Sequence, residues 1–221
     1  MTFDFGKARE AMVEQQVRPW DVLDPRVLEV LASLPREAFV SETHRALAYA
    51  DLALPIGHGE FMMKPVIEGR ALQALALAPT EAVLEIGTGS GFLTACLGRL
   101  SRSVTSLERH PEMVEAARAR LSLQGVTNAI VEHADAFTWS SDQRFDAICV
   151  TAAADVVPSR FLPWLRPGGR MFIVRGRAPV MEAVLVHRDG GTDVNAHRIE
   201  SLFETDLSYL AGAEPVPGFT F

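Results

Sequence analysis

The chain has 221 residues, 48% of them apolar, and a formal net charge of −7. This length and composition are enough to bury one main hydrophobic core. The negative charge and the lack of a lysine or arginine cluster argue against a nucleic-acid partner, because phosphate binding depends on basic patches. The first residues hold an acid and no apolar core segment, so we expect no secretory signal, no membrane association and a soluble, cytoplasmic protein.

The cysteines and histidines favour no metal centre. Cys96 and Cys149 fall in segments that should be buried, where a free thiol packs as a small hydrophobe. The six histidines are scattered and show no paired spacing typical of metal ligands. We therefore expect no structural or catalytic metal.

The segment before the first predicted strand is mainly helical. Residues Phe5 to Val40 have helical spacing, and Asp24 followed by Pro25 is a start signal for a second helix. The segment from Tyr49 to Lys64 contains proline, glycine and interleaved charged residues, which predicts an irregular loop that lies over a ligand and carries substrate contacts. A further helix is predicted from Pro65 through Leu77.

A glycine-rich turn follows, between a buried strand and a helix. Gly87, Gly89 and Gly91 allow the backbone to turn sharply and to approach a ligand without Cβ atoms in the way. The helix after the turn would direct its free N–H groups toward that ligand. The spacing of glycines at alternate positions therefore predicts a cofactor site.

The residues around this turn indicate which class of cofactor it binds. Phe92 stands where a dinucleotide-binding fold prefers a small residue, and the Gly-Lys-Ser/Thr of a P-loop is absent. Glu85 and the Gly-x-Gly-x-Gly pattern suit a cofactor with an amino-acid end and no phosphates. S-adenosylmethionine fits that description.

The next strands end in acidic residues. Glu108 ends a predicted strand that begins at Ser103, about twenty residues after the first glycine, where a βαβ unit places the carboxylate that binds ribose hydroxyls. Asp135 lies just beyond the predicted strand that begins at Ala129, and it is placed to meet the adenine amine. The predicted cofactor-binding residues are Glu85, Gly87, Thr88, Gly89, Ser90, Gly91, Glu108, Asp135, Ala136 and Thr151.

The remaining segments complete an α/β pattern. A fourth strand is predicted at 145–151, a short helix stopped by a glycine pair at 161–170, a fifth strand at 171–174, and a hairpin from the runs 181–186 and 197–203. This order predicts a doubly wound, mostly parallel Rossmann-like sheet with helices on both faces, an antiparallel edge and an N-terminal helical extension. We assign 1–64 to the extension and acceptor-site loop, and 65–221 to the cofactor-binding domain.

Several motifs carry a family resemblance over nearly the whole chain. They are the segments 12–18, 34–40, 49–59, 84–92, 108–109, 146–154 and 165–170. With these motifs the chain resembles class I S-adenosylmethionine-dependent methyltransferases, and more narrowly the protein-L-isoaspartate O-methyltransferase family. The resemblance implies methyl transfer to the carboxylate of isoaspartyl residues in damaged protein or peptide substrates, with S-adenosylhomocysteine as product.

The acceptor loop departs from the family pattern Gln-Thr-Ile-Ser-x-Pro, because residues 60–65 read Glu-Phe-Met-Met-Lys-Pro. Met63 stands at the family's active-site serine, Glu60 replaces a neutral amide, and His58 precedes them; these three are the candidate catalytic residues. A carboxylate acceptor is already ionised and needs orientation and hydrogen-bond donors, which methionine lacks. An ionised Glu60 nearby would repel it by on the order of a kcal/mol or more.

Three functions follow from this loop. The first is an isoaspartyl methyltransferase whose acceptor is held by loop backbone and His58, with Glu60 turned away. The second is a methyltransferase for a neutral or cationic acceptor, with Glu60 as base or counter-charge and Met62 and Met63 as an apolar wall. The third is a non-catalytic S-adenosylmethionine-binding protein. The family resemblance favours the first, and the sequence leaves the oligomeric state open.

Overall fold

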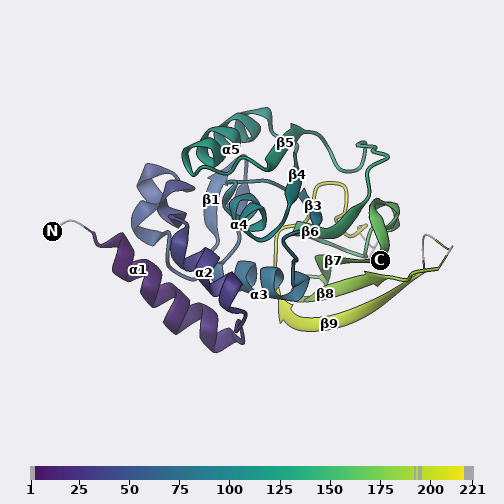
Figure 1. The fold of residues 1–221 in the computed structure, drawn as a ribbon, viewed down its shortest axis with the longest axis horizontal. Helices are drawn as coiled ribbons and strands as arrows, with labels where there is room; N and C mark the ends of the chain where they lie inside the picture. Colours follow the sequence, from purple (N-terminus) through teal and green to yellow (C-terminus); the bar gives the residue numbers. More distant parts are fainter. Residues whose placement is uncertain (1–2, 192, 194–195, 217–221) are drawn as a thin grey trace, which may run out of the picture.

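The fold centres on a mixed β-sheet in a computed structural model that describes residues 3–191, 193 and 196–216. Within these residues the main sheet has seven strands in the order β5-β4-β3-β6-β7-β8-β9 (Figure 1). The strands are β3 (Ala82–Ile86), β4 (Ser103–Glu108), β5 (Ala129–His133), β6 (Phe145–Ala154), β7 (Leu165–Arg177), β8 (Val180–Arg188) and β9 (His197–Thr205). Strands β3 to β7 pair in parallel, whereas β8 and β9 are antiparallel. The predicted fold class is confirmed.

Strand β3 is buried on both faces, as expected for the centre of a parallel sheet. Val83 packs into one hydrophobic core, and Leu84 and Ile86 pack into a second core on the opposite face. Side chains alternate along a strand, so Glu85 faces the same side as Val83. This alternation decides which side chains of β3 lie beneath the glycine turn.

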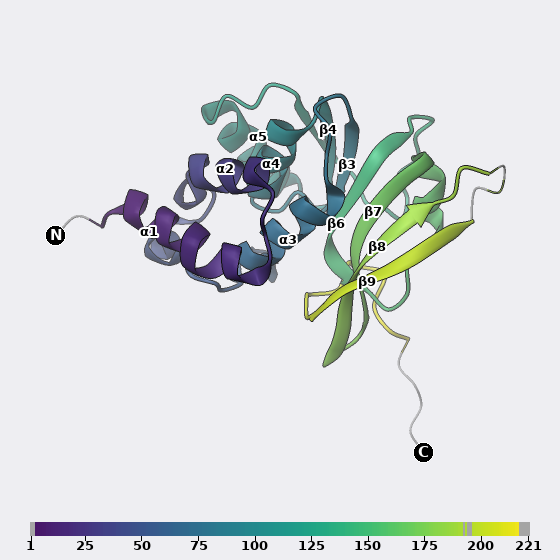
Figure 2. The same cartoon turned by 60° about the horizontal axis from the view of Figure 1, so that its bottom comes forward.

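The α-helices gather on the Val83 face of the sheet (Figure 2). They are α1 (Phe5–Met12), α2 (Pro25–Ser33), α3 (Pro65–Leu75), α4 (Phe92–Leu100) and α5 (Pro111–Leu123), with the short turns η1 (Val13–Val17), η2 (Arg18–Trp20), η3 (Arg36–Ala38) and η4 (Glu42–Leu47) among them. Helix α2 begins as predicted, since the Asp24 carboxylate accepts the backbone N–H of Arg26 at 2.9 Å and Pro25 occupies the first helical position. Helix α3 ends at Leu75, two residues before the predicted end, because Ala76 adopts a left-handed conformation.

The opposite face is covered by η5 (Ser159–Trp164) and by the connection between β5 and β6. Phe161 and Trp164 pack into the second core, and the Trp139 ring lies 4.9 Å from that of Trp164. The predicted helix at 161–170 is wrong at its end, because the helical turn stops at Trp164 and β7 begins at Leu165. Proline at 163 removes a backbone donor, and proline at 167 disfavours helical geometry at the residue before it.

The prediction of an irregular loop from Tyr49 to Lys64 is also wrong in part. Strands β1 (Leu54–Gly57) and β2 (Glu60–Met62) form an antiparallel hairpin. Its two turn residues, His58 and Gly59, have φ values of 55° and 79°. Positive φ at both residues matches the twist of a tight hairpin. The strands are too short to show alternation in the sequence, so only the turn signals were visible.

A buried ion pair joins the N-terminal helices to the sheet domain. Arg36 is 0% exposed, donates to the Glu68 carboxylate and to the Met63 carbonyl, and packs over the Phe92 ring with its Cζ 4.8 Å from the centroid. Burial raises the pKa of Glu68 to about 7, although the Arg36 guanidinium beside it favours the charged form. Residues on both sides of the predicted 1–64/65–221 boundary share one core, and the boundary itself stays a prediction.

We expect Arg36→Met to lower the free energy of unfolding by about 3–5 kcal/mol, because it leaves Glu68 buried without its partner. Urea denaturation followed by circular dichroism measures this. The double variant Arg36→Met/Glu68→Gln should recover part of the loss, and Arg102→Met at an exposed position is the control. A loss below about 1 kcal/mol in Arg36→Met would contradict the expected role of the pair.

Candidate active site

A cavity of about 310 Å³ lies at the carboxyl ends of β3, β4, β5 and β6. The chain leaves β3 toward β4 on one side of the sheet, while β6 pairs with β3 on the other side. The cavity therefore lies at the topological switch point, where open α/β sheets bind their ligands.

The glycine turn forms one wall of the cavity. Gly87 and Gly89 line it, with φ values of 95° and 54°. A Cβ atom on Gly87 would lie 2.3 Å from the Thr151 Oγ1 atom, so only glycine fits there. Thr151 also lines the cavity, and its hydroxyl donates to the Gly87 carbonyl at 2.7 Å. The turn is thus held against the end of β6.

Glu108 and Asp135 contribute carboxylates to the same wall. Glu108 is 5% exposed and accepts the backbone N–H groups of Gly89, at 2.9 Å, and His110, at 3.0 Å. Asp135 accepts the Phe137 N–H at 2.8 Å. Ala136 lines the cavity beside it. Two predicted cofactor carboxylates therefore face one cavity from neighbouring strand ends.

Four predicted cofactor-binding residues do not line the cavity and lie behind its wall. They are Glu85, Thr88, Ser90 and Gly91. The Thr88 and Ser106 hydroxyls hydrogen-bond at 2.5 Å. The Ser90 hydroxyl accepts the Phe92 N–H at 3.2 Å, and Gly91 caps α4 with φ 86°. Their contacts build the turn, and a direct contact with a cofactor stays a prediction.

Glu85 is a buried anchor under the turn. It is 0% exposed, and its Oε2 atom accepts the hydroxyls of Thr94 and Ser106, both at 2.5 Å. The pKa of Glu85 is raised to about 8, chiefly by burial and also by the nearby carboxylates of Glu108 and Glu68, against the Ser106 and Thr94 hydroxyls, which lower it. The carboxyl is therefore protonated at neutral pH. Through these two hydroxyls it connects β3, α4 and β4.

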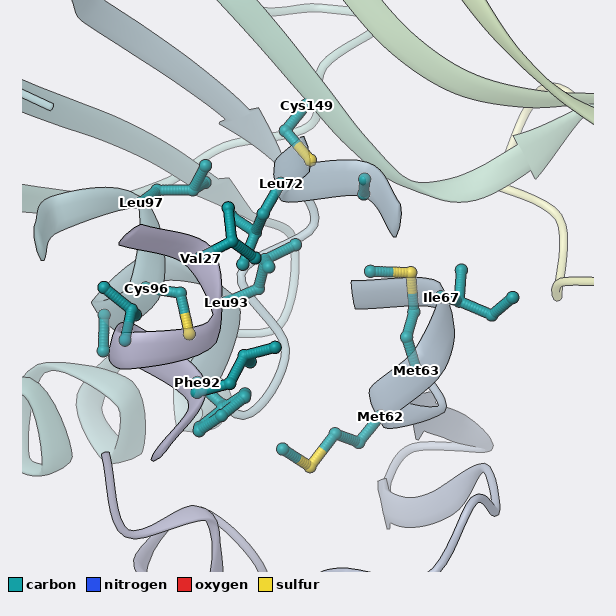
Figure 3. Packing of buried hydrophobic residues seen from close by; sticks show 14 of the residues in the cluster. Val27, Met62, Met63, Ile67, Leu72, Phe92, Leu93, Cys96, Leu97 and Cys149 are labelled. Atoms are coloured by element: carbon teal, nitrogen blue, oxygen red, sulfur yellow. The ribbon is translucent and has the colours of Figure 1, made fainter. Parts of the chain in front are cut away.

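The acceptor side of the cavity is apolar. Met62 and Met63 line it and are 3% and 5% exposed. Figure 3 shows both side chains within the hydrophobic cluster that also contains Ile67 and Phe92. The Met63 side chain offers no hydrogen-bond donor at the family's serine position, and its carbonyl already accepts from Arg36. Glu60 and Lys64 supply the charged groups of this side.

His58 does not lie in the cavity wall. Its ring stacks on that of His110, with centroids 4.3 Å apart, and its Nε2 atom lies 3.7 Å from the Glu112 Oε2 atom. Glu60 faces the same histidine pair, since its Oε1 atom lies 3.7 Å from the His110 Nε2 atom. The structure therefore brings together Glu60 and Met63 in the wall and leaves His58 behind it.

Sequence reasoning missed a C-terminal segment and a lysine. Residues 206–211, which follow β9, line the cavity. They return to the end of β6, where Ala153 N–H donates to the Ser208 carbonyl at 2.8 Å and Leu210 N–H donates to the Ala153 carbonyl at 2.7 Å. Residues 206–211 have no helical or strand periodicity that would have predicted their position. Lys64 could have been predicted, because it directly follows the family's serine position.

Within the described part of the chain, no group of three or more His, Cys, Asp or Glu side chains is placed to hold a metal ion. No helix there is long and apolar enough to cross a membrane. Cys96 and Cys149 are free and buried, and burial raises the pKa of both thiols.

The strand order and the cavity at its switch point define a Rossmann-like cofactor-binding fold. The family model for protein-L-isoaspartate(D-aspartate) O-methyltransferase (PCMT) matches residues 7–203, and the chain belongs to this family.

Individual relatives agree with this membership. Protein-L-isoaspartate O-methyltransferase 2 of Pelobacter propionicus is 39% identical over 208 residues, which cover 93% of this chain and 91% of the relative. The Caulobacter vibrioides protein-L-isoaspartate O-methyltransferase is 36% identical, with 94% and 93% covered. A Plasmodium falciparum structure described as a beta-aspartate methyltransferase (PCMT), in complex with S-adenosyl-L-homocysteine, superposes with a TM-score of 0.78 at 20% identity. It covers 91% of this chain and 97% of that chain, and it supports the fold.

We expect Glu85→Gln to change the pH dependence of stability. Between pH 4.5 and about 8 the unfolded chain ionises Glu85 while the folded chain holds it neutral, so the free energy of unfolding falls as the pH rises. The variant cannot ionise, so its stability relative to the wild type should rise from pH 5 to pH 8, by on the order of a few kcal/mol. Urea denaturation at both pH values measures this.

Glu29→Gln, at an exposed position, is the matched control and should leave the pH dependence unchanged. Glu68 is present in both proteins, so the difference between their slopes reports the titration of Glu85 together with its coupling to Glu68. Identical slopes for the wild type and Glu85→Gln would show that Glu85 is already ionised in the folded chain.

Proposed function

We propose that this protein is an S-adenosylmethionine-dependent methyltransferase that methylates the carboxylate of isoaspartyl residues in damaged proteins or peptides. The observation that carries the proposal is the switch-point cavity, which holds the glycine turn and Glu108 on one side and the β1-β2 hairpin on the other, in a member of the protein-L-isoaspartate O-methyltransferase family. The partner is a protein or peptide chain with isoaspartate, and the cytoplasm remains the predicted compartment.

The cavity wall suits the cofactor. Glu108 accepts two backbone N–H groups and has lone pairs left for ribose hydroxyls, since an ionised carboxylate offers about four acceptor sites. Gly87 and Gly89 expose backbone to the amino-acid end of the cofactor, and Asp135 with Ala136 would hold the adenine. When bound, S-adenosylmethionine supplies an electrophilic methyl group on a positively charged sulfur.

The protein needs no general base for this reaction. An isoaspartyl carboxylate is ionised at neutral pH and is itself the nucleophile. The protein has to orient one carboxylate oxygen toward the methyl carbon and keep water away. The buried side chains of Met62 and Met63 exclude water from this side of the cavity, and a less polar surrounding strengthens the attraction between the carboxylate and the positive cofactor.

Lys64 can supply the hydrogen-bond donors that Met63 lacks. It lines the cavity next to Met63, at the start of α3. Across the described residues no ion pair ties its ammonium group to an acid. A free ammonium group offers three donors and a positive charge to an incoming carboxylate. We therefore assign Lys64 to acceptor binding.

The experiment that tests this function is methyl transfer from labelled S-adenosylmethionine to an isoaspartyl peptide, with the normal aspartyl peptide as control. Calorimetry with S-adenosylhomocysteine checks cofactor binding separately. We expect label only on the isoaspartyl peptide. Cofactor binding without labelling of that peptide would refute the proposed acceptor.

Glu60 favours one other acceptor class, because a carboxylate in the cavity wall attracts cationic groups and can bind neutral donors. A panel of amine and hydroxyl acceptors tests this alternative. Methylation of such an acceptor in preference to the isoaspartyl peptide would establish it.

We expect Lys64→Met to raise the KM for the isoaspartyl peptide about tenfold, which corresponds to the loss of one charge-assisted hydrogen bond. Lys64→Arg keeps the charge and should retain most of the affinity. Steady-state kinetics measure both variants, and calorimetry should give an unchanged Kd for S-adenosylhomocysteine. An unchanged KM in Lys64→Met would remove this residue from the acceptor site.

A further inference from the structure

Four titratable side chains form a row that begins at Glu60 in the cavity wall and leads away from the cavity. The Glu60 Oε1 atom lies 3.7 Å from the His110 Nε2 atom, the His110 ring stacks on the His58 ring, and the His58 Nε2 atom lies 3.7 Å from the Glu112 Oε2 atom. Glu60 belongs to β2, His58 to the hairpin turn, and His110 and Glu112 to the start of α5. The row therefore joins the hairpin to the helix that follows Glu108.

His110 occupies the central place in this row. Its backbone N–H donates to the Glu108 carboxylate, whereas its ring meets Glu60 and His58. The Nε2 atom is buried and has no hydrogen-bond partner. Burying a ring nitrogen without a hydrogen-bond partner costs free energy of folding. Among the described residues, Glu60 is the only acid with a contact to this nitrogen. The His110 ring therefore has a free nitrogen that can interact with the Glu60 carboxylate.

Glu60 needs such a partner if the acceptor is a carboxylate. It lines the cavity that contains Met63 and Lys64, and 39% of its side chain is exposed. An unpaired negative charge there would repel the substrate and would compete for Lys64. The buried His110 Nε2 atom, 3.7 Å from the Glu60 Oε1 atom, is placed to draw the Glu60 carboxylate toward the cavity edge, which reduces both effects.

We propose that His110 is a positioning residue for methyl transfer, which holds the Glu60 carboxylate at the cavity edge so that an acceptor carboxylate can approach Lys64. The inference rests on the proposed isoaspartyl acceptor. His58 fixes the orientation of the His110 ring by stacking on it. Glu112 lies at the far end of the row, where its Oε2 atom is 3.7 Å from the His58 Nε2 atom.

The test uses three variants of the full chain: His110→Phe, Glu60→Gln and the two combined. Phenylalanine keeps a flat ring against His58 and removes the Nε2 atom that faces Glu60. We expect His110→Phe to raise the KM for the isoaspartyl peptide about five- to tenfold with little change in kcat, because one repulsive contact of about 1 kcal/mol corresponds to this factor. The combined variant should return to within about twofold of Glu60→Gln, since no carboxylate is left to be held.

Two further variants control for folding and for the loss of any histidine. His110→Gln keeps an N–H donor and should raise the KM less than His110→Phe does. His187→Phe removes a ring that pairs with Glu200 at 3.1 Å on the antiparallel edge, and it should change nothing. The affinity for S-adenosylhomocysteine should stay constant throughout, because Glu108 contacts the His110 backbone and not its ring.

A raised KM that Glu60→Gln does not restore would assign His110 a purely structural role and overturn the proposal. An unchanged KM in His110→Phe would overturn it as well. If the wild-type protein binds S-adenosylhomocysteine but does not methylate the isoaspartyl peptide, the proposed function itself is refuted. The wild-type assay shows this result before any variant is measured.

Discussion

The site depends on the close approach of the Gly87 backbone to Thr151. A side chain at position 87 would collide with the Thr151 hydroxyl, and the positive φ at Gly87 and Gly89 further restricts these positions to glycine. The hydroxyl of Thr151 holds the carbonyl of Gly87, which connects the turn after β3 to the end of β6. The cavity opens where these two strands diverge, so its shape follows from this contact.

A layer of buried polar groups supports the turn from below. Glu85, Thr94 and Ser106 join strand, helix and neighbouring strand through hydrogen bonds, and Thr88 extends this network into the turn itself. On the other side of the cavity the Arg36–Glu68 pair holds the carbonyl of Met63. Both supports are buried, so each wall of the cavity is held by its own hydrogen-bond network.

Much of this arrangement was predictable from sequence, because it depends on local signals. The glycine spacing, the acids at the ends of β4 and β5, and the proline that starts α2 each act through neighbouring residues. What was missed depends on distant contacts or on short strands. The β1-β2 hairpin has too few residues for a visible alternation, and the inward position of Glu85 beneath the turn, instead of within the cavity, depends on which face of β3 meets α4.

One wall of the cavity is formed by residues 206–211, which follow the last strand of the sheet. Its residues reach the site only after the chain has passed through both antiparallel strands, and they bond to Ala153, more than fifty positions earlier. The glycine turn and the parallel strands alone leave this wall of the cavity open. A complete ligand cavity therefore requires residues 206–211 to dock against β6, so cofactor affinity depends on the path of the chain after β9 as well as on the glycine turn.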